Sequence, residues 1–245
     1  MGMEGKKRFA VLLCAEDPDY VKKTYGGYLK VFTALLEDEG EIWDAFRVTK
    51  GELPAEEEIE IYDGFVVTGS ASDAHADEAW ILNLLAFLRR LHALQKRILG
   101  ICFGHQILSR ALGGSIGRAS NGWDIGVTCI HRSARANKLL IPPHLPVIQC
   151  HRDEVFDLPP HVEVLARSEK TGIEMFRCGD HIMGIQGHPE YTKDILLFLT
   201  DRLLQHNVIQ ASHAKAVKEV LNVREPDREA WERICKGFLK GGLVL

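Results

Sequence analysis

The segment Gly100–Gly104 (GICFG) places a single cysteine between two glycines. A short apolar run, residues 97–101, leads into it, and a helical pattern over residues 104–112 follows. A nucleophile on such a sharp strand-to-helix turn is lifted above the end of the strand, and small neighbours relieve the crowding there. The helix N-terminus favours the thiolate, and the N–H of Phe103 can bind a developing oxyanion. The motif predicts that Cys102 is a nucleophile.

A histidine and a glutamate near residue 190 can complete this chemistry. The strand-like run 182–186 ends in Gly-His-Pro-Glu, and Pro189 favours an extended backbone in which His188 and Glu190 lean to one face. The histidine can take the thiol proton and later give it to a leaving amine, while the glutamate accepts the other ring N–H. The two strand-to-helix junctions together predict a triad of Cys102, His188 and Glu190.

The other cysteines suggest no second reactive site. The six cysteines, at positions 14, 102, 129, 150, 178 and 235, contain no C-x-x-C pair, and we expect mostly buried, reduced thiols. A zinc site of Cys102, His105 and His188 is a rival interpretation, but only the first two have local ligand spacing and a closed site needs a fourth ligand. Cys150 and His151 should point to opposite faces of a strand. We therefore expect no metal.

Bulk properties narrow the class of protein. The chain has 245 residues, of which 46% are hydrophobic and 26% charged, with a net charge of −4. Such a balance is typical of a globular domain and gives no reason to expect a nucleic-acid or membrane surface. The N-terminus has no apolar leader and no apolar run approaches a membrane span, so we expect a cytosolic protein.

The elements that would position the triad alternate in the first half of the chain. Apolar runs typical of buried strands alternate with helical stripes, which predicts a three-layer α/β fold with a mostly parallel central sheet and helices on both faces. The expected strands of this half are residues 8–15, 42–48, 62–68 and 97–101, and the later helices are 78–91 and 104–112. For the middle of the chain, residues 116–184, the sequence predicts short strands and a turn near residues 136–140.

The last third of the chain is predicted to be helical. Apolar stripes cover residues 194–204, 212–221 and 227–239. Ser212 is a plausible N-cap of the second helix, and Pro226 suits the first turn of the third. We expect residues 1–245 to form a single domain with a helical extension from about residue 206.

The segments GICFGHQ and GHPE together resemble the class I glutamine amidotransferase family, over roughly residues 8–205. The resemblance implies a flavodoxin-like α/β fold and a Cys-His-Glu triad that hydrolyses the γ-amide of glutamine. It implies that Gln106 helps to hold the glutamine and that Gly69 supplies a second oxyanion N–H. His151, Arg152 and Asp153 fall where the family has an H-x-D segment near the substrate amino acid.

The chain also departs from that family. Its oxyanion loop is Thr68-Gly69-Ser70 instead of the usual Gly-Gly-Pro, and no Gly-rich nucleotide loop or second catalytic domain follows the triad. The segments TGSASDAHADEAWI, GRASNGWDIG and IQCHRDEV are more similar to plant γ-glutamyl peptidases, which cleave glutamate from glutathione conjugates. This resemblance implies a small γ-glutamyl substrate, a γ-glutamyl thioester, no cofactor and no obligatory synthetase partner.

Two alternatives to a peptidase remain open on the sequence. One is a glutaminase subunit that supplies ammonia to a partner synthetase, and the other is a silent binding protein on the same fold, against which the complete triad argues. In a peptidase, the leaving side should be lined by residues 70–77 and 121–124. Trp123 would offer a flat apolar face there, although it could equally be a core aromatic beside a turn.

Overall fold

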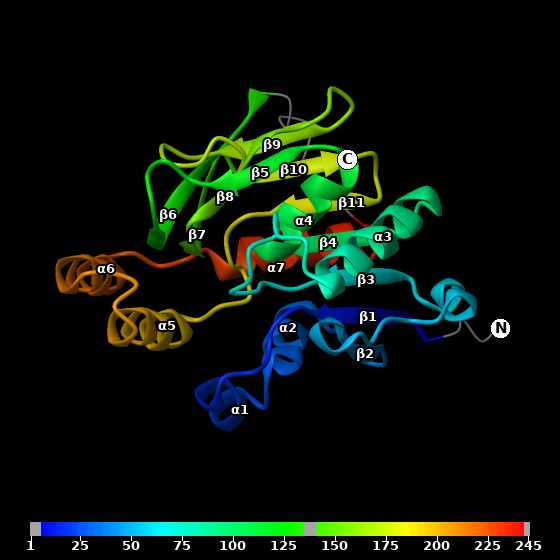
Figure 1. Cartoon of the computed structure of the whole chain (residues 1–245), viewed down its shortest axis with the longest axis horizontal. Helices are drawn as coiled ribbons and strands as arrows, with labels where there is room; N and C mark the ends of the chain where they lie inside the picture. Colours follow the sequence, from blue (N-terminus) through cyan, green and yellow to red (C-terminus); the bar gives the residue numbers. More distant parts are fainter. Residues whose placement is uncertain (1–5, 135–140, 243–245) are drawn as a thin grey trace.

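The computed structural model describes residues 6–134 and 141–242. Within these residues one sheet has nine strands in the order β2-β1-β3-β4-β11-β10-β9-β6-β7, and β5 pairs with β8 in a small separate sheet (Figure 1). The strands are β1 Arg8–Leu13, β2 Ile42–Arg47, β3 Gly64–Val67, β4 Arg97–Ile101, β5 Ser115–Arg118, β6 Asp124–Arg132, β7 His144–His151, β8 Asp153–Asp157, β9 Glu163–Arg167, β10 Met175–Cys178 and β11 Ile182–Ile185.

The large sheet has a parallel half and an antiparallel half. Strands β2, β1, β3, β4 and β11 are parallel, whereas β10, β9, β6 and β7 pair antiparallel beyond them. The predicted α/β fold, with helices around a mostly parallel central sheet, is confirmed, and the residues of the predicted triad follow the parallel strands β4 and β11. The antiparallel half is the strand-rich middle of the chain.

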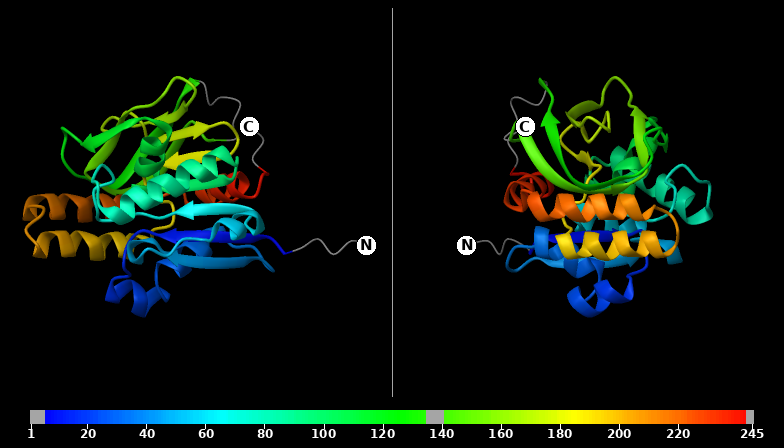
Figure 2. Two further views of the ribbon diagram at one scale, coloured as in Figure 1. Left: turned by 45° about the vertical axis from the view of Figure 1, so that its right-hand side comes forward. Right: turned by 90° about the vertical axis from the view of Figure 1, so that its left-hand side faces the viewer.

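Alternating side chains explain the three layers. In β1, Phe9 and Val11 face a core with α2 and α7, whereas Ala10 and Leu12 face a core with α3 and α4. Figure 2 shows the sheet between these helices. The helices are α1 Asp19–Tyr25, α2 Tyr28–Leu36, α3 Ala79–Ala93, α4 Phe103–Leu112, α5 Lys193–Gln205, α6 Ala211–Val223 and α7 Arg228–Leu239, with short 3₁₀ turns at Val48–Lys50 and Glu56–Ile61.

Helices α5 and α6 lie side by side and cover part of the β6–β7 hairpin (Figures 1 and 2). Their apolar stripes form a third core with Ile125, Val127 and Ile148 of the hairpin. In the described part of the chain, no helix is long and apolar enough to cross a membrane.

Two predicted helix starts are wrong. Helix α6 begins at Ala211 with Gln210 as N-cap, so Ser212 lies inside the helix. Pro226 precedes the N-cap of α7, which is Asp227, because the Asp227 carboxylate accepts the N–H of Ala230. The turn predicted near residues 136–140 lies outside the described residues.

Candidate active site

The turn between β4 and α4 holds Cys102 in a strained backbone conformation. Its φ is 53° and its ψ is −103°, outside the regions that L-residues favour, and it is the N-cap of α4. The flanking glycines make this turn possible: a Cβ on Gly100 would lie 2.5 Å from the carbonyl oxygen of Gly104, and one on Gly104 would overlap the carbonyl oxygen of Val67. The backbone therefore fixes the sulfur at the carboxyl edge of the parallel strands.

The segment after β11 places His188 and Glu190 beside this turn. The two side chains are buried, and Nδ1 of His188 lies 2.8 Å from Oε1 of Glu190. The N–H of His188 donates to the carbonyl of Ile148 at 2.7 Å, which ties the segment to β7. Because the glutamate occupies Nδ1, Nε2 is the ring nitrogen left for chemistry.

The electrostatics of these groups favour an ion pair. Burial by itself lowers the pKa of His188, but the Glu190 carboxylate and the Cys102 sulfur together raise this pKa to about 10. The proton therefore rests on the imidazole near neutral pH, so His188 is an imidazolium paired with the Glu190 carboxylate. Such an imidazolium can protonate a leaving nitrogen once a thiolate has attacked a carbonyl carbon.

The loop after β3 packs directly against this pair. A Cβ on Gly69 would lie 2.9 Å from Cε1 of His188 and 3.7 Å from Cβ of Cys102, so only glycine fits there. The Thr68 hydroxyl accepts the N–H of Cys14 at 2.9 Å and donates to the carbonyl of Gly69 at 3.2 Å, which fixes the loop. Phe103 is the first residue of α4, so its N–H has no partner within the helix.

A cleft with a volume of about 810 Å³ opens over the sulfur. Almost all of the predicted site residues line this cleft: Gly69, Cys102, Gln106, Trp123, His151, Arg152, Asp153, His188 and Glu190. Phe103 is the exception, since its ring is buried and stacks on Trp80 with 5.5 Å between centroids. Its predicted role needs only its N–H.

The sequence prediction missed a second glutamine beside the nucleophile. The Gln106 amide donates to the carbonyl of Asp153 at 3.0 Å and to Oε1 of Gln186 at 3.1 Å. The Gln186 amide in turn donates to Sγ of Cys102 at 3.7 Å. Gln186 directly precedes the GHPE segment, so its place at the end of the strand was the available clue.

The H-x-D segment forms a network that includes an arginine the sequence did not suggest. Nδ1 of His151 lies 3.0 Å from the carbonyl of Asp153, and burial lowers the pKa of this histidine to about 4. Burial raises the pKa of the Asp153 carboxyl, while Arg118, at 2.6 Å, opposes that shift. Arg118 also binds Asp73 at 2.9 Å and so joins the loop after β3 to β8.

The predicted leaving side is only partly present. Ser70, Ala71, Ser72 and Asp73 line the cleft, whereas Ala74 is buried, and the carbonyls of Ala74 and Ala76 accept from Arg110. Of residues 121–124, Trp123 lines the cleft, and the Arg152 guanidinium lies 5.7 Å from the centre of its ring. Arg202 of α5 and His206, the C-cap of that helix, also line the cleft, and the sequence prediction did not include them.

A tyrosine stack supports the histidine. The ring of Tyr191 lies parallel to that of His188, with 4.0 Å between centroids and 3° between planes. Tyr28, whose pKa burial raises to about 12, also stacks on Tyr191, with 6.3 Å between ring centroids, and lines the cleft. The stack limits rotation of the imidazole, and its only sequence clue was the position of Tyr191 directly after Glu190.

His105, a member of the rival zinc trio, points into the core. Its ring packs against Phe176 with 4.8 Å between centroids, and burial lowers its pKa to about 3. A Cβ on Gly184 would lie 2.8 Å from Nδ1 of His105. The structure thus separates this histidine from the cleft that Cys102 and His188 share.

The turn between β4 and α4 that carries Cys102 is a nucleophile elbow. This elbow and the fold together define a class I glutamine amidotransferase domain. The sequence profile of the family "Glutamine amidotransferase class-I" matches residues 38–195, and the chain belongs to this family. The glutamine amido transferase of Methylobacillus flagellatus has the same fold, with a TM-score of 0.74 at 19% identity over 97% of this chain and 95% of that one. A glutamine amidotransferase of Thermotoga maritima gives a TM-score of 0.72 at 22% identity, over 96% and 95% of the two chains.

Curated relatives of higher identity are peptidases by name. Gamma-glutamyl peptidase 3 of Arabidopsis thaliana is 45% identical over 98% of this chain and 99% of its own length. Gamma-glutamyl peptidase 5 of the same plant is also 45% identical, over 96% of each chain.

Proposed function

We propose that this protein is a thiol hydrolase that cleaves the γ-glutamyl amide bond of glutathione conjugates or other γ-glutamyl peptides and releases glutamate. The observation that carries the proposal is the buried pair of His188 and Glu190 beside Cys102 in a strained elbow. The names of the relatives with 45% identity over nearly the full chain support the substrate class.

The proposed mechanism has two half-reactions through one acyl-enzyme. The Cys102 thiolate attacks the γ-carbonyl carbon, and the N–H groups of Gly69 and Phe103 stabilise the resulting oxyanion. The imidazolium of His188 then protonates the leaving nitrogen as the C–N bond breaks, which leaves a γ-glutamyl thioester and neutral imidazole. Water, deprotonated by His188, hydrolyses the thioester and restores the ion pair. The steps use only side chains, backbone N–H groups and water, so we propose no cofactor.

The other predicted residues have roles in binding in this proposal. Gln106, His151 and Asp153 hold the glutamyl group, with Gln186 and Arg118 as their partners. The cleft extends far beyond the space that ammonia would need as a leaving group, and this favours a peptide.

Cations in the cleft support a leaving peptide with a carboxylate. Arg152 lies over Trp123, and Arg202 of α5 lines the same cleft. A guanidinium pairs well with a carboxylate, and such a bond contributes to catalysis when it persists in the transition state. We also propose that the chain acts alone, without a synthetase, and as a single domain, because α7 packs on the same sheet as α2.

We propose a cytosolic location on the basis of the thiols. All six cysteines, which lie in the described ranges, are unpaired. Free thiols are typical of a reducing compartment.

Steady-state kinetics on the purified chain test this function. Glutamate release is measured with glutamine, glutathione and a glutathione S-conjugate, and with Cys102→Ala as the blank. We expect kcat/KM for the conjugate to exceed that for glutamine by roughly ten- to hundredfold, since one charge-assisted hydrogen bond retained in the transition state contributes about 1.5–3 kcal/mol. If glutamine is the better substrate, alone or only after a partner synthetase is added, the glutaminase alternative is correct.

A further inference from the structure

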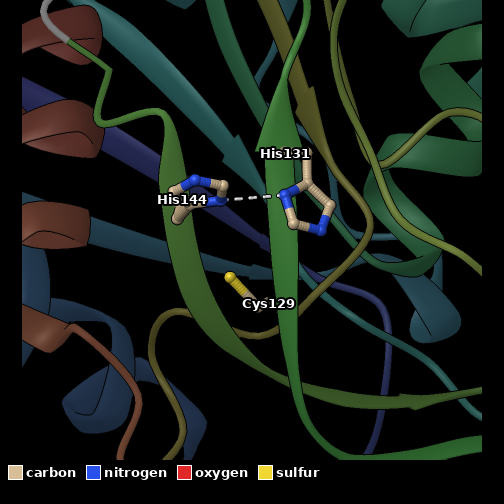
Figure 3. A group of neighbouring side chains, drawn as sticks. All are labelled: Cys129, His131 and His144. Carbon is tan, nitrogen blue, oxygen red and sulfur yellow. Dashed lines mark hydrogen bonds between the residues drawn. The ribbon is translucent and has the colours of Figure 1, made fainter.

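Three side chains of types that bind metal ions, those of Cys129, His131 and His144, gather on the β6–β7 hairpin (Figure 3). His131 of β6 pairs directly with His144 of β7 in the antiparallel register. Cys129 stands two residues before His131, so both side chains emerge from the same face of β6. The backbone ladder therefore sets the positions of all three groups.

The face that carries them is the one that α6 covers further along the hairpin. Ile125 and Val127 lie on this same face of β6, four and two residues before Cys129, and pack against α6 in the third core. Beyond Val127 the helix no longer covers the strand, and Cys129 is half-buried while His131 and His144 are exposed. Three potential ligands thus replace apolar residues where this face meets solvent.

The donor atoms are close enough for one ion. The Nδ1 atoms of His131 and His144 lie 2.9 Å apart, and ligand atoms of all three residues lie within 4.8 Å of one another. We propose that Cys129, His131 and His144 bind a borderline-soft divalent cation such as Zn²⁺, with water as the fourth ligand. One thiolate and two imidazoles suit Zn²⁺, at about 2.3 Å from sulfur and 2.0–2.1 Å from nitrogen, after small side-chain rotations.

Proton balance gives the site a measurable signature. The Cys129 thiol must lose its proton to become a ligand. The histidine pair shares one N–H between two ring nitrogens, and that hydrogen moves to the other nitrogen of its own ring when the metal binds, without net release. At a pH where both imidazoles are neutral, binding therefore releases about one proton for each ion bound.

The position of the site predicts a structural effect rather than a catalytic one. At the other end of the same hairpin, Asp124 of β6 pairs with His151 of β7 beside the cleft. Asp124 and His131 are seven positions apart in an extended strand, which corresponds to about 23 Å. An ion held by both strands would clamp this end of the hairpin, and would raise stability by binding only the folded state.

The experiment uses Co²⁺ as a spectroscopic probe on the full chain carrying Cys102→Ala, so that the active-site thiol cannot bind metal. We expect one Co²⁺ per chain with a thiolate-to-cobalt charge-transfer band, and release of about one proton per ion by calorimetry in buffers of different ionisation enthalpy. Cys129→Ser should abolish the band, and His131→Gln or His144→Gln should weaken binding roughly tenfold or more.

The matched control is His92→Gln. His92 belongs to another histidine pair, with His181 at 2.9 Å, and within the described residues this pair is not part of a group of three potential metal ligands. It should leave the band and the affinity unchanged. In the unsubstituted chain, Zn²⁺ should protect Cys129 from iodoacetamide, mapped by mass spectrometry. Three results would each overturn the proposal. They are metal binding without the thiolate band, a loss of affinity in His92→Gln equal to that in His131→Gln, and alkylation of Cys129 at saturating Zn²⁺.

Discussion

The two halves of the large sheet fix their functional groups in different ways. In the parallel half, Cys102 is held by the backbone, because a side chain on Gly100 or Gly104 would collide with neighbouring main chain or core side chains. In the antiparallel half and the small β5–β8 sheet, the groups around the cleft are held by side chains, such as Arg118 with Asp153 and Lys170 with Asp124.

This difference separates the chemistry from the recognition of the substrate. A nucleophile needs a geometry accurate to fractions of an ångström, and steric exclusion supplies that accuracy. Recognition can vary between related proteins by exchange of side chains at little cost to the fold. Substitutions in the parallel half should therefore change kcat or folding, while those in the antiparallel half should change KM or respond to pH.

The largest effect should follow the loss of the nucleophile. Cys102→Ala should lower kcat for glutamate release by about 10⁴-fold or more, because the residual oxyanion N–H groups cannot form a thioester. The unfolding temperature should stay close to that of the unsubstituted chain, since the change removes one sulfur. Substantial glutamate release by the purified, folded variant would contradict the role of this half.

Next in size is a test of the steric argument. Gly104→Ala should lower the free energy of unfolding by about 3 kcal/mol or more, because the new methyl group overlaps the carbonyl oxygen of Val67. Denaturant unfolding gives the value. The control is Gly172→Ala, where no atom lies within 4 Å of the added Cβ. Equal stability of the two variants would show that the elbow is not sterically fixed.

Removal of the acceptor should cost less than removal of the base. The loss of kcat in Glu190→Gln should be roughly 100-fold smaller than the loss in His188→Ala, because the glutamate orients the imidazole but transfers no proton. The neutral amide also removes the charge that raises the pKa of His188 to about 10. The imidazolium is lost as pH rises through that pKa, so the alkaline limb of kcat/KM should move to lower pH in Glu190→Gln. A limb that does not move would contradict the ion pair.

A buried carboxyl of the antiparallel half should give a smaller, pH-dependent effect. Burial raises the pKa of Glu174 to about 7, although Gln149 donates to its carboxylate at 2.8 Å. Because the pKa is higher in the folded state, the free energy of unfolding falls as pH rises from the ordinary pKa of a glutamate toward 7. The full loss is present above pH 7. Glu174→Gln should therefore stabilise the protein by about 2 kcal/mol at pH 8 and by little at pH 4. Thermal melts at both pH values measure this, and equal effects at the two would refute it.

The smallest effect should come from the bridge between the halves. Arg118→Met should raise KM by about tenfold with little change in kcat, because it frees Asp73 and Asp153 without touching the triad. Arg110→Met, which removes contacts behind the same loop, is the comparison. A fall in kcat with KM unchanged would place Arg118 in the chemistry instead.

Sequence patterns predicted the parallel half better than the antiparallel half. The G-x-C-x-G turn and the GHPE segment each lie at the end of a strand, so local sequence patterns were enough to predict that Cys102 and His188 lie near each other. Arg118, Gln186 and Tyr191 were missed because their partners are distant in the chain or their role depends on stacking. The cluster of Cys129, His131 and His144 was missed because it needs the register of β6 with β7. Ser212 was misplaced as a cap because helix ends are decided by single hydrogen bonds.

The last described helix completes the core around the first strand. Trp231 and Phe238 of α7 belong to the same apolar cluster as Phe9, and Leu239 approaches Gly64 of β3. The Trp231 indole also donates to the carbonyl of Pro146 at 2.9 Å, on the edge strand β7. During synthesis, the strands that precede α7 in the chain therefore expose an apolar face and a sheet edge until α7 is made, and both features promote aggregation.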